Sequence, residues 1–402
     1  MNAFSRVATT KEHLCWEKSI ARQKPIYQRE NEIRSEFGRD YTRLLHSKAY
    51  RRLKHKTQVF FAANNDHVCT RIEHVNHVSS VSYNIANYLG LNTELVLAIA
   101  IGHDIGHAPF GHDGEYILRN IAEKHYNGNF WHEQNGLFFA DNIESLQNEQ
   151  GDEETLNLTY AVRDGIVSHC GEVDDRSLFP REEYIDLETI SEPSIYNPFT
   201  WEACIVKVAD KISYLGRDLE DAIRLKIIQK DEQAELKDII TSYWGAKHGS
   251  SSNTALIHSF ATDLCMNSSP DKGILFSEKC FQTILDIKKF NYKYIYKHPR
   301  LNYYKQYAAL IIHSIFDTLN EHYHSISELK RNLENKKQIF PKLIQSFEKW
   351  LITYSDYRKK GKENIIYPVG KSRETYQRCI VDFISSMSDS FAIEMFNELT
   401  TF

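Results

Sequence analysis

Proline and glycine are scarce in this chain of 402 residues, which holds 9 prolines and 17 glycines. Proline lacks the amide hydrogen that a helix interior needs, so its scarcity favours helix over sheet. The hydrophobic fraction of 42% and the charged fraction of 26% are ordinary for a globular protein. We therefore expect an all-α protein with a large buried core.

Long apolar runs are missing as well. The longest, Leu95 to Ile101, is far shorter than the roughly 20 residues that span a bilayer. The N-terminal residues include no apolar stretch typical of a secretory signal, so we expect a cytoplasmic protein with no membrane partner. The seven cysteines lie far apart, from Cys15 to Cys379, and predict reduced thiols rather than a disulfide framework or a zinc ribbon.

An excess of positive charge is also absent. The net charge of −5 argues against bulk attraction to nucleic acid. Basic residues nevertheless gather at residues 43–56 and at residues 288–307, where they alternate with tyrosines. Such a tract can follow a phosphate backbone and stack bases, or it can be a solvated helix face. Binding of single-stranded nucleic acid therefore remains an alternative function.

Histidines and acids, in contrast, are concentrated at residues 101–115, which read IGHDIGHAPFGHDGE. A single histidine on an apolar helix is usually a hydrogen-bonded core residue. Several imidazoles beside carboxylates instead offer nitrogen and oxygen lone pairs to a divalent cation. The segment therefore predicts part of a metal site, whose other ligands lie elsewhere in the chain.

Apolar residues at helical spacing predict helices over residues 74–89, 94–106 and 201–225. Gly90 is expected to end the first helix, and Asn92 or Thr93 to cap the second. In the third helix, the i, i+4, i+8 spacing puts three polar groups on one face, namely Asp210, Tyr214 and Asp218. Further helical segments are expected at residues 256–266, 276–290, 304–322, 325–353 and 373–399.

The order of His74, His103-Asp104 and Asp210 resembles the H…HD…D pattern of the HD-domain metal-dependent phosphohydrolases. Other segments narrow the resemblance to the deoxynucleoside triphosphate triphosphohydrolase branch, the dGTPase-like proteins. These are RRLKHKTQVF at residues 51–60, Asn65-Asp66, WHEQNG at 131–136, DGIVSHCGE at 164–172 and ADKISYLGRDLED at 209–221.

The resemblance implies an all-α HD-domain fold with additional C-terminal helices. Residues 1–60 would form an N-terminal helical segment with a basic stretch that contacts substrate. Residues 61–230 would form the catalytic core, and residues 231–402 a helical region that packs on the core and takes part in oligomer contacts.

The resemblance also implies four metal ligands, which are His74, His103, Asp104 and Asp210. This set fits manganese, magnesium, iron or cobalt, and zinc is admissible too. The remaining roles concern the substrate. His107 and His112 would lie beside the phosphates, with His112 as proton donor, Glu115 as its orienting group, and His132 and Glu133 in support. Gln58 and Arg71 would hold sugar and triphosphate, while Lys211, Tyr214 and Asp218 would grip phosphate and check the deoxyribose.

The implied reaction is hydrolysis of dGTP, or of several dNTPs, to deoxynucleoside and triphosphate. The alternatives are an HD phosphohydrolase that acts on another nucleotide and a nucleic-acid-binding protein whose metal site is not catalytic. The family pattern further implies a homo-oligomer, either a tetramer or a hexamer, and admits a nucleotide effector or single-stranded DNA. His77 lies where bacterial dGTPases often have glutamate, and Lys211 matches the residue of the animal dNTP triphosphohydrolase that follows the last metal-binding Asp. The base preference therefore stays open.

Overall fold

The computed structural model describes residues 3–27, 30–60, 67–148, 150–170, 176–245, 252–321, 323, 325–357 and 365–401. Its α-helices are α1 (Trp16–Ile20), α2 (Glu36–His46), α3 (Lys48–Arg52), α4 (Arg71–Leu89), α5 (Thr93–Gly102), α6 (Gly111–Tyr126), α7 (His132–Phe138), α8 (Tyr160–Ser168), α9 (Trp201–Arg224), α10 (Lys230–Trp244), α11 (Asn253–Asn267), α12 (Glu278–Asn291), α13 (Pro299–Asn320), α14 (Ile326–Lys337), α15 (Pro341–Tyr354), α16 (Arg373–Ser385) and α17 (Asp389–Thr400). In the described residues, the strands form two small antiparallel pairs, β1 (Ser145–Gln147) with β2 (Glu153–Thr155) and β3 (Ser177–Leu178) with β4 (Ile274–Leu275). The all-α prediction is confirmed.

The three helices that the sequence predicted most directly are present, although the helix predicted over residues 94–106 ends at Gly102, and residues 103–106 form a turn. A capping box at Thr70 starts α4, and Gly90 ends it in the left-handed conformation, with φ of 83°. The Asn92 side chain caps α5 by accepting hydrogen bonds from the amides of Glu94 and Leu95, at 3.1 and 3.2 Å. The cap at Thr70 fixes the end of α4 that carries His74, while His103 follows the last residue of α5, at the end opposite Asn92.

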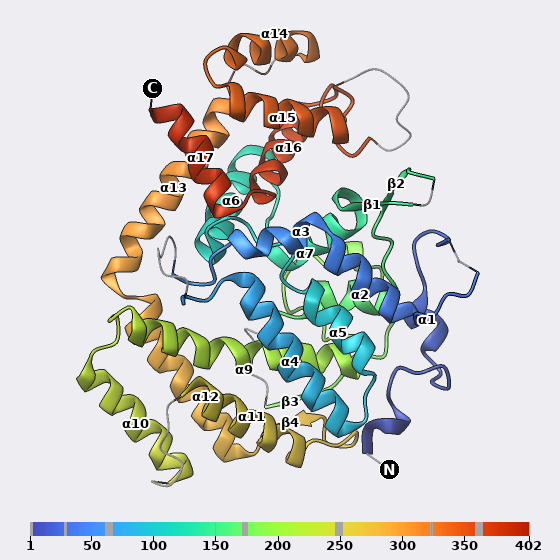
Figure 1. The fold of residues 1–402 in the computed structure, drawn as a ribbon, viewed down its shortest axis with the longest axis vertical. Helices are drawn as coiled ribbons and strands as arrows, with labels where there is room; N and C mark the ends of the chain where they lie inside the picture. Colours follow the sequence, from blue (N-terminus) through green and yellow to red (C-terminus); the bar gives the residue numbers. More distant parts are fainter. Residues whose placement is uncertain are drawn as a thin grey trace.

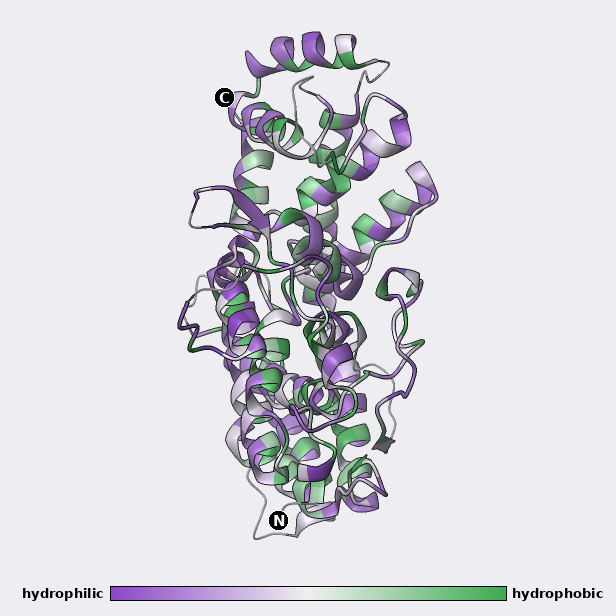
Figure 2. Ribbon diagram, turned by 90° about the vertical axis from the view of Figure 1, so that its right-hand side faces the viewer, coloured by the Kyte–Doolittle hydropathy of each residue, from purple (hydrophilic) through white to green (hydrophobic). Residues whose placement is uncertain are grey.

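The two largest of the three hydrophobic clusters in the described residues lie in different parts of the molecule. The first joins α4, α5 and α9 with α11 and α12, and it continues along the chain to Leu301. The second joins α6 with α13, α15, α16 and α17, shown at the top of Figure 1. The outermost helix, α14, is mostly hydrophilic in Figure 2 and buries Leu329 and Leu333. The proposed division of the chain at residue 230 remains a prediction.

Two of the predicted C-terminal segments were wrong as single helices. Residues 325–353 form two helices, because the chain turns before Pro341, which occupies the first turn of α15. Residues 373–399 also form two, since Ser388 leaves the helical conformation and caps α17 by accepting a hydrogen bond from the Phe391 amide. Within the described ranges, no helix has both the length and the apolar character required to cross a bilayer.

Candidate active site

The segment that carries His103 and Asp104 leaves α5 at Gly102 and runs tightly against α7. Gly106 allows this approach, because a Cβ atom there would lie 2.1 Å from the His132 carbonyl oxygen and the Gly136 nitrogen. The first turn of α4 brings Arg71 and His74 to the same place, and α9 brings Asp210. Local backbone geometry thus delivers side chains from three helices to one point.

Four side chains that the sequence predicted as metal ligands lie together, and we call His74, His103, Asp104 and Asp210 the His/Asp cluster. His74 Nε2 lies 2.9 Å from Asp210 Oδ1 and 3.9 Å from Asp104 Oδ2. His103 Nε2 lies 3.5 Å from Asp104 Oδ1 and 4.0 Å from Asp210 Oδ1. The ligand atoms of His74, His103 and Asp210 all fall within 4.8 Å of one another, which is close enough to hold one metal ion.

The hydrogen bonding of His103 fits a metal ion as well. Its Nδ1 lies 2.7 Å from the Ala100 carbonyl oxygen, so Nδ1 carries the proton and Nε2 keeps a free lone pair. That buried Nε2 has no hydrogen-bond partner among the described residues. Buried polar atoms normally have partners, and a cation between the carboxylates would satisfy this one.

The protonation state of each side chain in the His/Asp cluster depends on its charged neighbours. Burial disfavours both ionised forms, yet the hydrogen bond between His74 and Asp210 raises the pKa of His74 and lowers that of Asp210 to about 2. Burial also opposes ionisation of Asp104, but His107, His103 and Arg71 hold its pKa well below the usual range. Both carboxylates are therefore anionic near neutral pH and suited to a cation.

A second group lies beside the first, and we call His107, His112, Glu115 and His132 the His/Glu cluster. Its ligand-type atoms also lie within 4.8 Å of one another. Glu115 Oε2 is 2.9 Å from His132 Nδ1 and 3.6 Å from His112 Nδ1. The rings of His107 and His132 stack at a centroid distance of 3.7 Å.

The histidines of this cluster differ in charge. Burial lowers the pKa of His132, but Glu133 and Glu115 more than offset it and raise the pKa to about 9. Burial and then the Arg71 guanidinium keep the pKa of His107 well below its ordinary value. His132 is therefore cationic and His107 neutral at pH 7. His112 has the most open side chain of the four, with 64% of it exposed.

A cavity of about 450 Å³ joins the two clusters. Twelve of the fourteen predicted site residues line it, which are Gln58, Arg71, His74, Asp104, His107, His112, Glu115, His132, Glu133, Asp210, Tyr214 and Asp218. His103 lies fully buried behind this surface. Lys211 is buried in α9 and is not among the lining residues, so its contact with phosphate remains a prediction.

Several residues that line the same cavity were not among the fourteen predicted site residues. His169 joins His103 and Asp104 in a further group of ligand-type atoms. Other lining residues of this kind are Tyr116 and Arg119 and, from the tract at residues 288–307, Lys288, Tyr292, Tyr296 and Lys305. The i, i+4, i+8 spacing of Lys288, Tyr292 and Tyr296 was the available signal. Asn65-Asp66 and the last two residues of the DGIVSHCGE segment lie outside the described residues.

Tyr296, from the tract at residues 288–307, contacts Asp218, which the family resemblance assigns to the deoxyribose. The Tyr296 hydroxyl donates to Asp218 Oδ2 at 2.5 Å. Burial raises the pKa of Asp218 to about 6 even though this hydrogen bond opposes the rise. Asp218 thus changes charge close to neutral pH, unlike Asp210 two turns earlier on the same helix face.

Comparison with known families agrees with this geometry. Residues 71–215 match the HD domain, and residues 274–339 match the phosphohydrolase-associated domain. The helical fold and the His/Asp cluster within it define an HD-domain phosphohydrolase. The chain belongs to the family of deoxyguanosinetriphosphate triphosphohydrolase-like proteins.

Proteins of that name from three bacteria show how far the likeness extends. The protein from Caldanaerobacter subterraneus subsp. tengcongensis is 30% identical, with alignment over 92% of this chain and 86% of the relative. Those from Rickettsia felis and Rickettsia rickettsii are each 33% identical over 91% of this chain, covering 92% and 91% of the relative. The likeness therefore extends well beyond the HD motif into the C-terminal helices.

Proposed function

We propose that this protein hydrolyses deoxynucleoside triphosphates, dGTP or several dNTPs, to deoxynucleoside and triphosphate in a metal-dependent reaction. One observation carries the proposal. Arg71 lines the cavity and is 1% exposed, and its Nε and Nη2 have no hydrogen-bond partner among the described residues. Its Nη1 donates to Asp104 at 2.9 Å, which ties it to the His/Asp cluster. A polyphosphate beside a divalent ion satisfies both the bare guanidinium and the paired acids.

The metal would be held by His74, His103, Asp104 and Asp210. When bound, a divalent ion there supplies Lewis-acid stabilisation of the charge on phosphate oxygens. The nitrogen and oxygen donor set suits manganese, magnesium, iron or cobalt, with zinc also admissible, and the affinity order favours a transition metal over magnesium.

The chain supplies the proton for the leaving group. In the reaction, the oxygen of water bonds to the α-phosphorus while the bond from that phosphorus to the 5′ oxygen breaks. The 5′ oxygen needs a proton, and His112 is the open imidazole positioned to donate it. Glu115 lies 3.6 Å from His112 Nδ1 and orients the ring, and it also binds His132. Glu133 supports the charge on His132.

The sugar and triphosphate would lie along the other walls. Gln58 and Arg71 would hold them from the side of α4, and Lys211 would add positive charge from α9. Tyr214 lines the cavity one turn after Asp210, and its ring against the sugar would leave no room for a 2′-hydroxyl. Asp218 would accept a hydrogen bond from the sugar next to the Tyr296 hydroxyl.

A product assay tests the proposal. Each of the four dNTPs, with GTP as control, is incubated with Mn²⁺ or Mg²⁺, and triphosphate is resolved from pyrophosphate and phosphate. We expect triphosphate from at least one dNTP and none without metal. Release of pyrophosphate or phosphate instead would indicate an HD phosphohydrolase acting on other bonds or other nucleotides.

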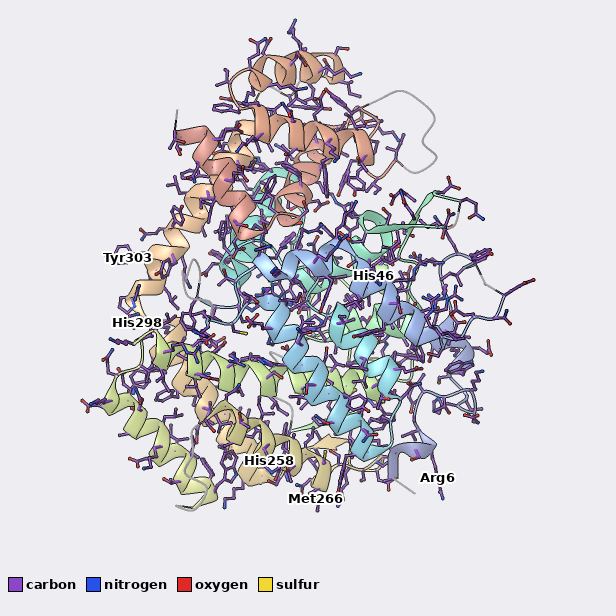
Figure 3. The ribbon with its side chains drawn as sticks, viewed as in Figure 1. Arg6, His46, His258, Met266, His298 and Tyr303 are labelled. Carbon is purple, nitrogen blue, oxygen red and sulfur yellow. The ribbon has the colours of Figure 1, made fainter. Side chains whose placement is uncertain are left out.

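Nucleic-acid binding stays as a second candidate because part of the basic and aromatic tract faces outward. Tyr303 is 73% exposed and projects from the outer side of α13 (Figure 3). Lys288, Tyr292 and Lys305 line the cavity instead, which favours a nucleotide over a strand. Salt-dependent binding of single-stranded DNA with no dNTP turnover would favour the second candidate.

The family likeness also supports three predictions about the protein in its cell. We expect a homo-oligomer, tetramer or hexamer, in the cytoplasm, with a nucleotide or single-stranded DNA as effector. Native mass measurements with and without each dNTP test the assembly state.

A further inference from the structure

The loop between His107 and His112 adopts an unusual backbone conformation. Phe110 has φ of +66° and Gly111 has φ of +62°, so two consecutive residues lie in the left-handed region. This region is unfavourable for a residue with a side chain such as phenylalanine, and it persists only where neighbouring groups hold it. Two site histidines lie at the ends of this loop, so whatever holds it sets their positions.

The holding group is a carboxylate from the far end of the chain. Asp389, the first residue of α17, is 5% exposed. Its Oδ1 accepts a hydrogen bond from the Phe110 amide at 2.8 Å. Its Oδ2 accepts hydrogen bonds from the Thr57 amide at 2.9 Å and from the Thr57 hydroxyl. One side chain therefore joins the loop to the segment that carries Gln58.

Lys56 completes the junction from the other side. Its buried ammonium donates to the His107 carbonyl oxygen and, at 3.1 Å, to the Ser385 carbonyl oxygen in α16. Its own carbonyl accepts the Arg71 amide at 3.0 Å. The loop is thus held at the His107 carbonyl by a buried lysine and at the Phe110 amide by a buried acid. Burial lowers the pKa of Lys56 well below its ordinary value and raises that of Asp389, while the attraction between the two side chains opposes both shifts.

We propose that Asp389 is a positioning residue for the active site, which fixes the loop from His107 to His112 and the Thr57-Gln58 segment relative to each other. This inference rests on the proposed function for its catalytic consequence. Among the described residues, Asp389 neither lines the cavity nor belongs to the His/Asp cluster. Its effect is to hold the proton donor and a substrate-binding amide in register with each other, and small displacements of such groups are costly to rate.

The test compares Asp389→Asn with Asp382→Asn. Asparagine keeps the size of the side chain but replaces one acceptor oxygen with an NH₂ group, which cannot accept from Phe110 or Thr57. Asp382 is an equally buried acid on α16 that accepts from the Tyr367 hydroxyl at 2.7 Å and does not line the cavity. Metal content, melting temperature, kcat, KM and amide hydrogen exchange are measured for both variants and the wild type.

For Asp389→Asn we expect a loss of about 10²-fold in kcat with metal content retained. Peptides covering residues 105–115 and 55–60 should exchange at least tenfold faster, while exchange elsewhere stays unchanged. Asp382→Asn should leave kcat within about twofold and these two peptides unchanged. Thr57→Val, which removes only the hydroxyl donor, should show a smaller version of the Asp389 effect and serves if Asp389→Asn does not fold.

Two outcomes would overturn the proposal. One is that Asp389→Asn and Thr57→Val keep wild-type kcat and wild-type exchange in both peptides. The other is that both lose activity only as far as Asp382→Asn does. If the wild type hydrolyses no dNTP, the proposed function fails by itself, and the exchange measurements still decide whether Asp389 holds the loop.

Discussion

The His/Asp cluster and the His/Glu cluster use the same two kinds of side chain but balance them differently. The first has two acids for two imidazoles, and both acids are anionic, so a cation completes it. The second has one acid for three imidazoles, and a cationic His132 already neutralises Glu115. Under the proposed function, the ratio of acids to imidazoles would separate a site for a metal from a site for phosphate and proton transfer.

Substitution of His103 should have the largest effect, because it tests directly whether the His/Asp cluster holds a metal ion. In His103→Ala the two carboxylates lose an imidazole that shares the cation, so we expect metal content to fall and kcat to drop by at least about 10³-fold, since several kcal/mol of charge stabilisation are lost. Metal analysis and dNTP turnover check this. His46→Ala, an exposed histidine on α2 (Figure 3), is the control and should change neither. Full turnover in His103→Ala would refute the ligand assignment.

Removing the proton donor should separate the two clusters. In His112→Gln we expect kcat to fall by about 10²-fold while bound metal stays at the wild-type level, because general acid help is lost and the His/Asp cluster is intact. The loss should shrink for a substrate whose leaving group needs no proton, such as a nitrophenyl ester of a nucleotide. Equal loss of metal and rate would mean that the two clusters act as one.

Sequence periodicity predicted the cavity residues on α9 but did not indicate that Tyr296 lies beside them. Asp210, Tyr214 and Asp218 share a face because all three belong to α9, and a helical repeat reports such neighbours directly. Tyr296 reaches Asp218 across 78 positions of sequence, and only tertiary packing of α12 and the turn after it brings them together.

Long-range polar contacts could not be predicted from the sequence for the same reason. Asp389 lies 332 positions from Thr57, and no local pattern links them. The family resemblance supplied roles for residues within its motifs, but no residue of α17 had an assigned role. The sequence analysis did not predict the left-handed backbone at Phe110 either, although Pro109 and Gly111, two residues typical of turns, flank it.

The α9 wall offers a sharper test of substrate choice. In Tyr214→Ala the space beside the sugar opens, so we expect the preference for dGTP over GTP to fall by about 10-fold, an effect typical of a lost steric contact. The ratio of kcat/KM for the two nucleotides measures it. Tyr303→Ala, on the exposed side of α13, is the control and should leave the ratio unchanged.

The smallest expected effect concerns Asp382, a buried acid outside both clusters, in comparison with Asp210 of the His/Asp cluster. Asp210 is partly buried and its pKa falls to about 2 among imidazoles, whereas burial raises the pKa of Asp382 to about 6 despite the nearby Arg378. A raised folded pKa means that Asp382 favours the folded state below its unfolded pKa and loses that contribution as pH rises through about 6. Wild-type stability should therefore decline between about pH 4 and 6 by up to roughly 3 kcal/mol from this group, and Asp382→Asn should remove that slope. Chemical denaturation across this pH range measures it, and an unchanged slope in the variant would show that Asp382 ionises freely in the fold.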